Sequence, residues 1–252
     1  MKFLEAEFAD DPIGFSREAL GLWTSTSEAA VIPMELWRSL GVPDLALGEE
    51  IYVAVDVASP KHGAGASICA GALQHTADGT PPKVKVAHIE SRQGMDMTWI
   101  AKKLLQMSMN QHIVTIVVDG AAAGFLEAEL RMSHLSGRLQ QVSVQTVSSY
   151  AKQFVNLVYD QLLQYRSDVD LLSSVENACQ RYVAHGKTWL WDKIYDEGPQ
   201  ITLVGGISLV AGHVQRMMDP VAAQTDDLNA SVGVERVSNG TTERSDALIS
   251  AF

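Results

Sequence analysis

The sequence lacks any apolar run of the roughly 20 residues that a membrane-spanning helix needs, and its acidic first residues do not form a secretory signal. It has only two cysteines, Cys69 and Cys179, which stand in apolar stretches without the spacing of metal ligands. Such cysteines are typical of reduced, buried thiols in a cytoplasmic protein.

Basic residues are also scarce. There are 19 Lys and Arg against 30 Asp and Glu, which gives a formal net charge of −11. A protein that binds nucleic acid tightly on its own usually carries a basic surface, so this balance argues against such a function. The sequence shows no convincing Ser–His–acid pattern. The glycines within residues 63–65 lack the Gly-Lys-Ser/Thr ending of a P-loop and precede a strand, so no ATPase phosphate loop is predicted.

What the sequence does contain is two apolar, β-branched stretches, at residues 51–58 and 113–120, each with the length of a buried strand. Each carries one aspartate, Asp56 or Asp119. A buried carboxylate is costly unless it is paired or protonated, and two that lie together also repel each other. A divalent cation such as Mg²⁺ or Mn²⁺ relieves both penalties. We therefore expect Asp56 and Asp119 to lie on neighbouring strands and to share metal.

A second interpretation of these aspartates stays open. An Asp at the end of a strand is often a turn former or a helix N-cap. This applies most to Asp119, which precedes Gly120 and a predicted helix, and less to Asp56, after which the strand continues.

The order of elements predicts an α/β fold, with a mixed α+β sheet and helices on both faces. Three antiparallel strands are followed by a helix, a strand, a second helix, a fifth strand and further helices. The expected strands are 51–58, 66–73, 83–89, 113–120 and 141–147, and the expected helices are 97–109, 123–135, 149–165, 171–183 and 203–218. A right-handed parallel crossover between strands four and five gives the ribonuclease H-like order 3-2-1-4-5, with Asp56 and Asp119 side by side. We expect an N-terminal arm at 1–48 that packs Trp23 and Trp37 on the domain, the sheet domain at 49–218 and a C-terminal tail at 219–252.

Several segments together resemble the C-terminal nuclease domain of phage large terminase subunits, which cut concatemeric DNA during packaging. Residues 53–57 resemble the first catalytic strand of that family, and residues 117–120 with 123–126 resemble the second. Further matching segments are 17–23 with 32–33 and Trp37, 151–154 and 189–191. The resemblance covers roughly residues 15–213 and implies that an ATPase domain precedes the arm.

The resemblance also implies a third acid at the start of the last helix, and here the sequence departs from the family, because Gln200 stands about where Asp is expected. Asp196 is favoured as the third acid because it is near that position. The other candidates are Asp192, Glu197 and Asp246.

In the chemistry that the resemblance implies, two Mg²⁺ or Mn²⁺ ions lie ~3.5–4 Å apart between these carboxylates and hydrolyse a phosphodiester of double-stranded DNA. Asp56 would bridge both ions, Asp119 would bind one, and the third acid, Asp196, the other. The implied partners are DNA, other terminase subunits and the portal protein, in the cytoplasm of the host cell and without a membrane.

Two alternatives remain at this stage. A catalytically weak or inactive ribonuclease H-like docking module is favoured by the absent third acid and the acidic composition. An actin-like ATPase shares the strand order, but Ala58, Ser59 and Pro60 follow Asp56 where that fold has a Gly-Thr phosphate turn. The candidate residues for contacts to the phosphate backbone of DNA are Lys61, His62, Lys102, Lys103 and Lys152.

Overall fold

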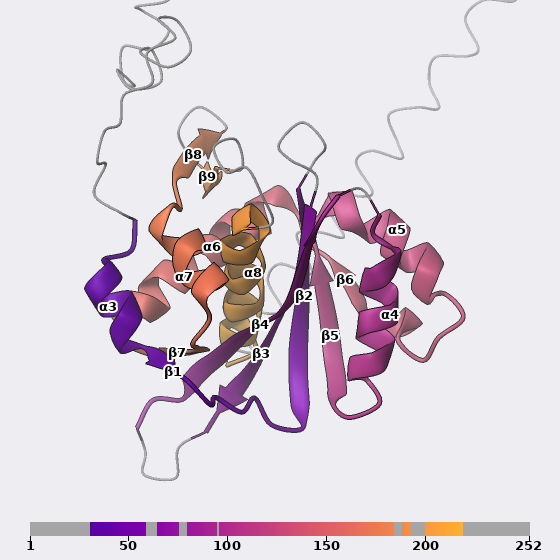
Figure 1. Cartoon of the computed structure of the whole chain (residues 1–252), viewed down its shortest axis with the longest axis horizontal. Helices are drawn as coiled ribbons and strands as arrows, with labels where there is room; N and C mark the ends of the chain where they lie inside the picture. Colours follow the sequence, from indigo (N-terminus) through magenta and orange to yellow (C-terminus); the bar gives the residue numbers. More distant parts are fainter. Residues whose placement is uncertain are drawn as a thin grey trace, which may run out of the picture.

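A computed structural model describes residues 31–58, 65–75, 80–94, 96–183, 188–192 and 200–218. In these residues a central sheet lies between two layers of helices (Figure 1). None of the helices in these ranges combines the length and apolar character that crossing a membrane demands.

The sheet has seven strands in the order β1-β7-β4-β3-β2-β5-β6. β2, β3 and β4 form an antiparallel meander, whereas β5 and β6 extend it in parallel on one side. β7 and β1 extend it in parallel on the other side. The strands are β1 Gly41–Val42, β2 Glu50–Ala58, β3 Gly65–Gln74, β4 Lys83–Gln93, β5 His112–Val118, β6 Leu139–Gln141 and β7 Leu163–Arg166.

The segment β4-β3-β2-β5-β6 reproduces the expected order 3-2-1-4-5, so the ribonuclease H-like mixed sheet is confirmed. Two corrections apply. The fifth strand is Leu139–Gln141 rather than 141–147, because Ser143 caps a helix that begins at Val144, with its side chain accepting a bond from the Thr146 N–H. The sheet also has two strands more than expected, β1 and β7.

Helices cover both faces of the sheet (Figure 1). The buried side chains Val53 and Val55 of β2 belong to a core cluster with α4 and α5, whereas Ala54 belongs to a second cluster with α6 and α8. This alternation follows from the two-residue period of a strand. The helices are α3 Met34–Ser39, α4 Thr98–Met107, α5 Gly120–Leu130, α6 Val144–Tyr159, α7 Val169–Glu176 and α8 Gln200–Met218.

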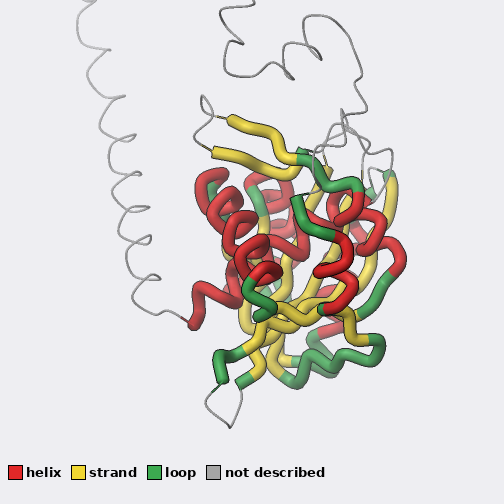
Figure 2. Tube along the Cα trace, turned by 90° about the vertical axis from the view of Figure 1, so that its left-hand side faces the viewer, coloured by secondary structure: helices red, strands yellow, loops and turns green. Residues whose placement is uncertain are grey.

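Strands β8 (Gln180–Val183) and β9 (Thr188–Trp191) form a separate antiparallel pair. Figures 1 and 2 both show it at the end of the molecule where β2 and β5 end. The indole N–H of Trp191 donates to Ser208 Oγ of α8 at 3.0 Å, which ties this pair to the helix layer. The segment 171–183, expected to be one helix, is therefore α7 followed by β8.

The N-terminal arm contributes to the core through Trp37 of α3, as expected, whereas Trp23, for which the same was expected, lies outside the described residues. The Trp37 ring is fully buried and stacks on Tyr165 of β7, with centroids 4.1 Å apart and planes at 9°. It also meets Phe154 of α6 edge-on at 5.9 Å. The arm then adds β1 to the sheet edge, so its described part is built into the fold.

A buried histidine in α8 makes stability sensitive to acid. His213 is fully buried between Tyr52 and Tyr150. Burial, followed by the charge of Arg216, lowers the pKa of His213 from 6.5 to about 4. The unfolded chain therefore takes up this proton at higher pH than the folded chain. The contribution of neutral His213 to the free energy of unfolding is fully present above about pH 6.5. It is lost as pH falls towards 4, by on the order of 3 kcal/mol.

We expect the variant His213→Phe to lose less stability than the natural chain between about pH 7.5 and pH 5. Urea unfolding at both pH values measures this difference. The carboxylates titrate in both proteins, so they cancel in the comparison. Equal losses in the two proteins would contradict the assignment to His213.

Candidate active site

The first predicted aspartate, Asp56, lies in the buried part of β2 with 2% of its surface exposed. It follows Ala54 on the sheet face that α6 and α8 cover. Its partner in β3 is Ser67, whose hydroxyl donates to the Thr202 carbonyl of α8 at 2.6 Å. The start of α8 is thus bonded to the strand beside Asp56.

The second aspartate, Asp119, follows the last residue of β5 and is half-buried. β2 and β5 are parallel neighbours in which Ala54 pairs with Val117 and Val55 with Val118. Continuing this register by one residue would set Asp119, which directly follows β5, opposite Asp56. Because neighbouring strands lie about 5 Å apart, this register is consistent with the two acids being neighbours at this end of the sheet.

Asp119 also meets the second interpretation of its position. Its Oδ1 accepts a long bond of 3.4 Å from the Ala122 N–H, and its carbonyl accepts from the N–H groups of Ala122 and Ala123. The residue therefore caps α5 while its side chain stands at the carboxyl end of β5.

Helix α8 packs closely on Asp56 because it has glycine at the contact. A Cβ at Gly205 would lie 2.2 Å from Asp56 Oδ2 and 3.0 Å from its Cγ. A Cβ at Gly206 would lie 2.9 Å from Cys69 Sγ and 3.1 Å from Ser67 Oγ. The carboxylate of Asp56 therefore occupies the space that a side chain at position 205 would fill.

The neighbouring cysteine is held as a neutral thiol. Burial raises the pKa of Cys69, and the charge of nearby Asp56 raises it further. A neutral thiol is a poor nucleophile and metal ligand. The chemistry of this region therefore depends on carboxylate oxygen.

The third acid cannot be placed among the described residues. Asp196, Glu197 and Asp246 lie outside them. Asp192 lies inside them, where its backbone N–H donates to the Cys179 carbonyl at 2.8 Å. In the part of the chain that the structure describes, no three His, Cys, Asp or Glu side chains gather closely enough to bind a metal ion. Gln200 is the first residue of α8, the position at which the resemblance implies an acid.

The residues predicted to contact the DNA backbone do not lie together in the fold. Lys61 and His62 lie outside the described residues. Lys102 and Lys103 lie on α4 beside β4, whereas Lys152 is exposed on α6. The role of Gly205 was not predicted, although paired glycines inside an apolar helix could have indicated a close approach to another element.

Comparisons with known proteins give matches in structure alone. No family model matches the chain, and no curated protein is similar to it in sequence. The large terminase of bacteriophage HK97 is similar at 11% identity and a TM-score of 0.56, over 73% of this chain and 43% of that one. The large terminase nuclease of thermophilic phage G20c is similar at 14% identity and a TM-score of 0.51, over 72% of this chain and 96% of that one. The fold is that of a large terminase nuclease.

The two matches differ in how much of the other protein they cover. The chain spans less than half of the HK97 large terminase but nearly all of the G20c terminase nuclease. At such low identity the likeness shows a shared fold. The terminase nuclease fold confirms the architecture expected from the sequence.

Proposed function

We propose that this chain is a metal-dependent endonuclease domain of a phage DNA-packaging terminase. In this proposal it hydrolyses phosphodiester bonds of double-stranded DNA with Mg²⁺ or Mn²⁺. The observation that supports the proposal is the register of β2 and β5, in which Val55 pairs with Val118, the residues directly before Asp56 and Asp119. The likeness of the fold to terminase nucleases is consistent with it.

The residues present fit a hard divalent cation. Carboxylate oxygen is the ligand that Mg²⁺ and Mn²⁺ prefer, and both acids offer it from rigid strand ends. Asp56 is buried and packs against Gly205, whereas Asp119 is half-buried directly after β5. Divalent cations bound there supply activation of water and stabilisation of the charge that develops on the departing oxygen.

Each acid has a distinct part in the proposal. Asp56 is the shared ligand, because it is held most tightly. Asp119 completes the pair, and its capping bond to α5 orients it. Asp196 remains our proposed third ligand. A preorganised carboxylate set costs little rearrangement when the cation binds, which favours positioning of the scissile phosphate.

Cleavage of supercoiled plasmid in Mn²⁺ tests the function. We expect Asp56→Asn and Asp119→Asn each to lower the cleavage rate by more than the roughly 10- to 100-fold cost of losing an outer-shell partner of a metal ligand. Asp160→Asn, at the exposed C-terminus of α6, makes the same change away from the site and serves as the matched control. Cleavage that survives Asp56→Asn would rule out this mechanism.

One observation favours a second candidate, a docking module without catalysis. Gln200 begins α8, and the described residues supply two acids rather than three. Calorimetric titration with Mn²⁺ separates the two functions, since a docking module would show no binding at millimolar levels. Binding that Asp196→Asn weakens would support the nuclease.

A further inference from the structure

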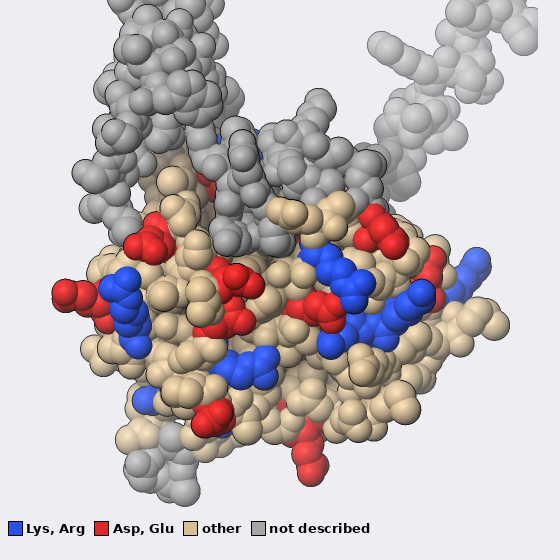
Figure 3. Space-filling model, viewed as in Figure 1, with Lys and Arg blue, Asp and Glu red and all other residues tan. Residues whose placement is uncertain are grey.

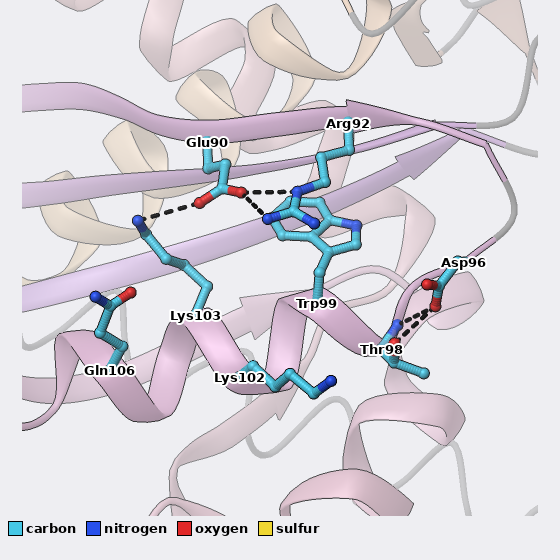
Figure 4. A pocket seen from close by; sticks show the side chains of 8 residues that line it. All are labelled: Glu90, Arg92, Asp96, Thr98, Trp99, Lys102, Lys103 and Gln106. Carbon is cyan, nitrogen blue, oxygen red and sulfur yellow. Dashed lines mark hydrogen bonds and ion pairs between the residues drawn. The ribbon is translucent and has the colours of Figure 1, made fainter.

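A shallow depression of about 240 Å³ lies between the end of β4 and the outer face of α4. Figure 4 shows three basic side chains around it, from Arg92 of β4 and from Lys102 and Lys103 of α4. Figure 3 shows basic side chains gathered on this side of the molecule. The lining also includes Glu90 and Asp96.

Two of the three basic side chains, those of Arg92 and Lys103, are held in place by contacts with their neighbours Glu90 and Trp99. Glu90 Oε1 accepts from Arg92 Nε at 2.7 Å and Nη2 at 2.5 Å, and Glu90 Oε2 pairs with Lys103 Nζ at 3.1 Å. The Arg92 guanidinium lies over the Trp99 ring, 4.9 Å from its centroid. Although burial raises the pKa of Glu90, the bonds from Arg92 and Lys103 outweigh it and lower the pKa overall. Glu90 thus stays ionised and orients both cations, so less side-chain freedom is lost when a ligand binds.

The other carboxylate that lines the depression, Asp96, accepts two hydrogen bonds from Thr98. Asp96 Oδ1 accepts from the N–H and hydroxyl of Thr98, at 2.9 and 2.7 Å, at the start of α4. These bonds lower the pKa of Asp96. Lys102 is exposed, and its ammonium lies along α4 toward Thr98 (Figure 4). Three cations against two carboxylates leave the depression with a positive balance.

The depression opens at the same end of the sheet as the acid pair. Asp56 pairs with Ser67, and Ser67 pairs with Ser91 of β4, the residue before Arg92. Asp56, Ser67 and Ser91 thus lie side by side across β2, β3 and β4, and Arg92 follows Ser91 in β4. Because Arg92 contacts Trp99 of α4, it lies on the opposite face of the sheet.

The acidic composition of the chain does not oppose a basic site here. Residues 1–30 and 219–252 each contain six acidic and two basic side chains, so together these two segments contribute −8 of the formal net charge of −11. The rest of the chain is close to neutral. Most of the acidic excess of the sequence therefore belongs to these two segments, whereas the lining of the depression carries three cations and two carboxylates.

We propose that the Arg92–Lys102–Lys103 depression binds phosphates of the double-stranded DNA backbone, at the end of the sheet at which β2 and β5 also end. This assignment rests on the proposed nuclease function, and it names a contact outside the catalytic groups. Arg and Lys contacts to phosphate position DNA without reading its sequence.

Fluorescence anisotropy of the full chain with a labelled duplex of about 30 base pairs in EDTA, from about 50 to about 200 mM salt, tests the proposal without cleavage. We expect Lys102→Ala to weaken binding several-fold and to reduce the slope of log K against log salt by about 0.9, and Lys102→Ala with Lys103→Ala to reduce it by about 1.8. Arg38→Ala removes the same charge from exposed α3 at the far edge of the sheet and should leave the slope unchanged.

An unchanged slope in the double variant overturns the proposal, as does a natural chain that does not bind the duplex. Polyglutamate that competes with DNA at equal charge would show a general polyanion surface and would also overturn it. The plasmid assay reports separately on function. If cleavage persists with an unchanged slope, only this contact fails; if cleavage is absent but the slope falls as expected, the contact stands and the nuclease function fails.

Discussion

Gly205→Ala should weaken Mn²⁺ binding at the site proposed for Asp56 and Asp119, although it adds only one methyl group. The new Cβ would lie 2.2 Å from Asp56 Oδ2, closer than any real contact, so the carboxylate must turn away or α8 must shift. Overpacking of this kind costs about 1–3 kcal/mol of stability. Displacing the ligand should lower Mn²⁺ affinity by at least about 10- to 100-fold.

Gly124→Ala provides the matched control, because Gly124 is exposed within α5 and a Cβ there meets nothing within 4 Å. An alanine inside a helix normally gains about 0.5–1 kcal/mol over glycine. The two substitutions should therefore shift stability in opposite directions. Calorimetry with Mn²⁺ and urea unfolding measure both effects, and full metal affinity in a folded Gly205→Ala protein would refute the packing argument.

Replacing Trp37 with alanine should destabilise the whole domain by about 3–5 kcal/mol, the usual cost of removing a large buried aromatic side chain. Trp37 is fully buried and contacts both Tyr165 and Phe154. Domains of this kind are stable by only about 5–15 kcal/mol in total. Urea unfolding should therefore show a midpoint far below that of the natural chain.

Trp37→Phe keeps an aromatic ring and should cost much less than Trp37→Ala. It also removes an indole N–H that has no hydrogen-bond partner among the residues that the structure describes, which offsets part of the lost packing. Arg38→Ala changes the exposed neighbour in the same helix and should be nearly neutral. A small effect of Trp37→Ala would mean that α3 is dispensable for the fold.

The central sheet was predictable because its strands are long, β-branched and separated by clear turn signals. The short strand β7 was not. Its preceding helix ends at Asp160, and Gln161 follows with a φ of 57°. Glycine usually marks such a left-handed position, but glutamine gives no sequence signal. Because Leu162 and Leu163 continue the apolar spacing, the helix was predicted to run on to residue 165.

Asp56 and Asp119 could be proposed as a pair for a similar reason, since a carboxylate inside an apolar strand stands out in the sequence. The third ligand was not, because several acids lie close together in the sequence and spacing alone does not select one. Gly205 posed the opposite problem. Single-residue propensity counts glycine against a helix, whereas its value here comes from a contact with Asp56, which is remote in sequence.

The irregular pairing of β3 with β4 decides which chemistry each side of the sheet presents. Ile68 pairs with Glu90 and Cys69 with His88, so Ile89 is an extra residue in β4. Such a bulge reverses the alternation beyond it. If Ile89 instead paired regularly with Ile68, Glu90 would pair with Ser67 and turn towards Asp56, which would add a negative charge there, and the guanidinium of Arg92 would leave Trp99. One bulged residue thus keeps Glu90 and Arg92 on the face of the sheet opposite Asp56.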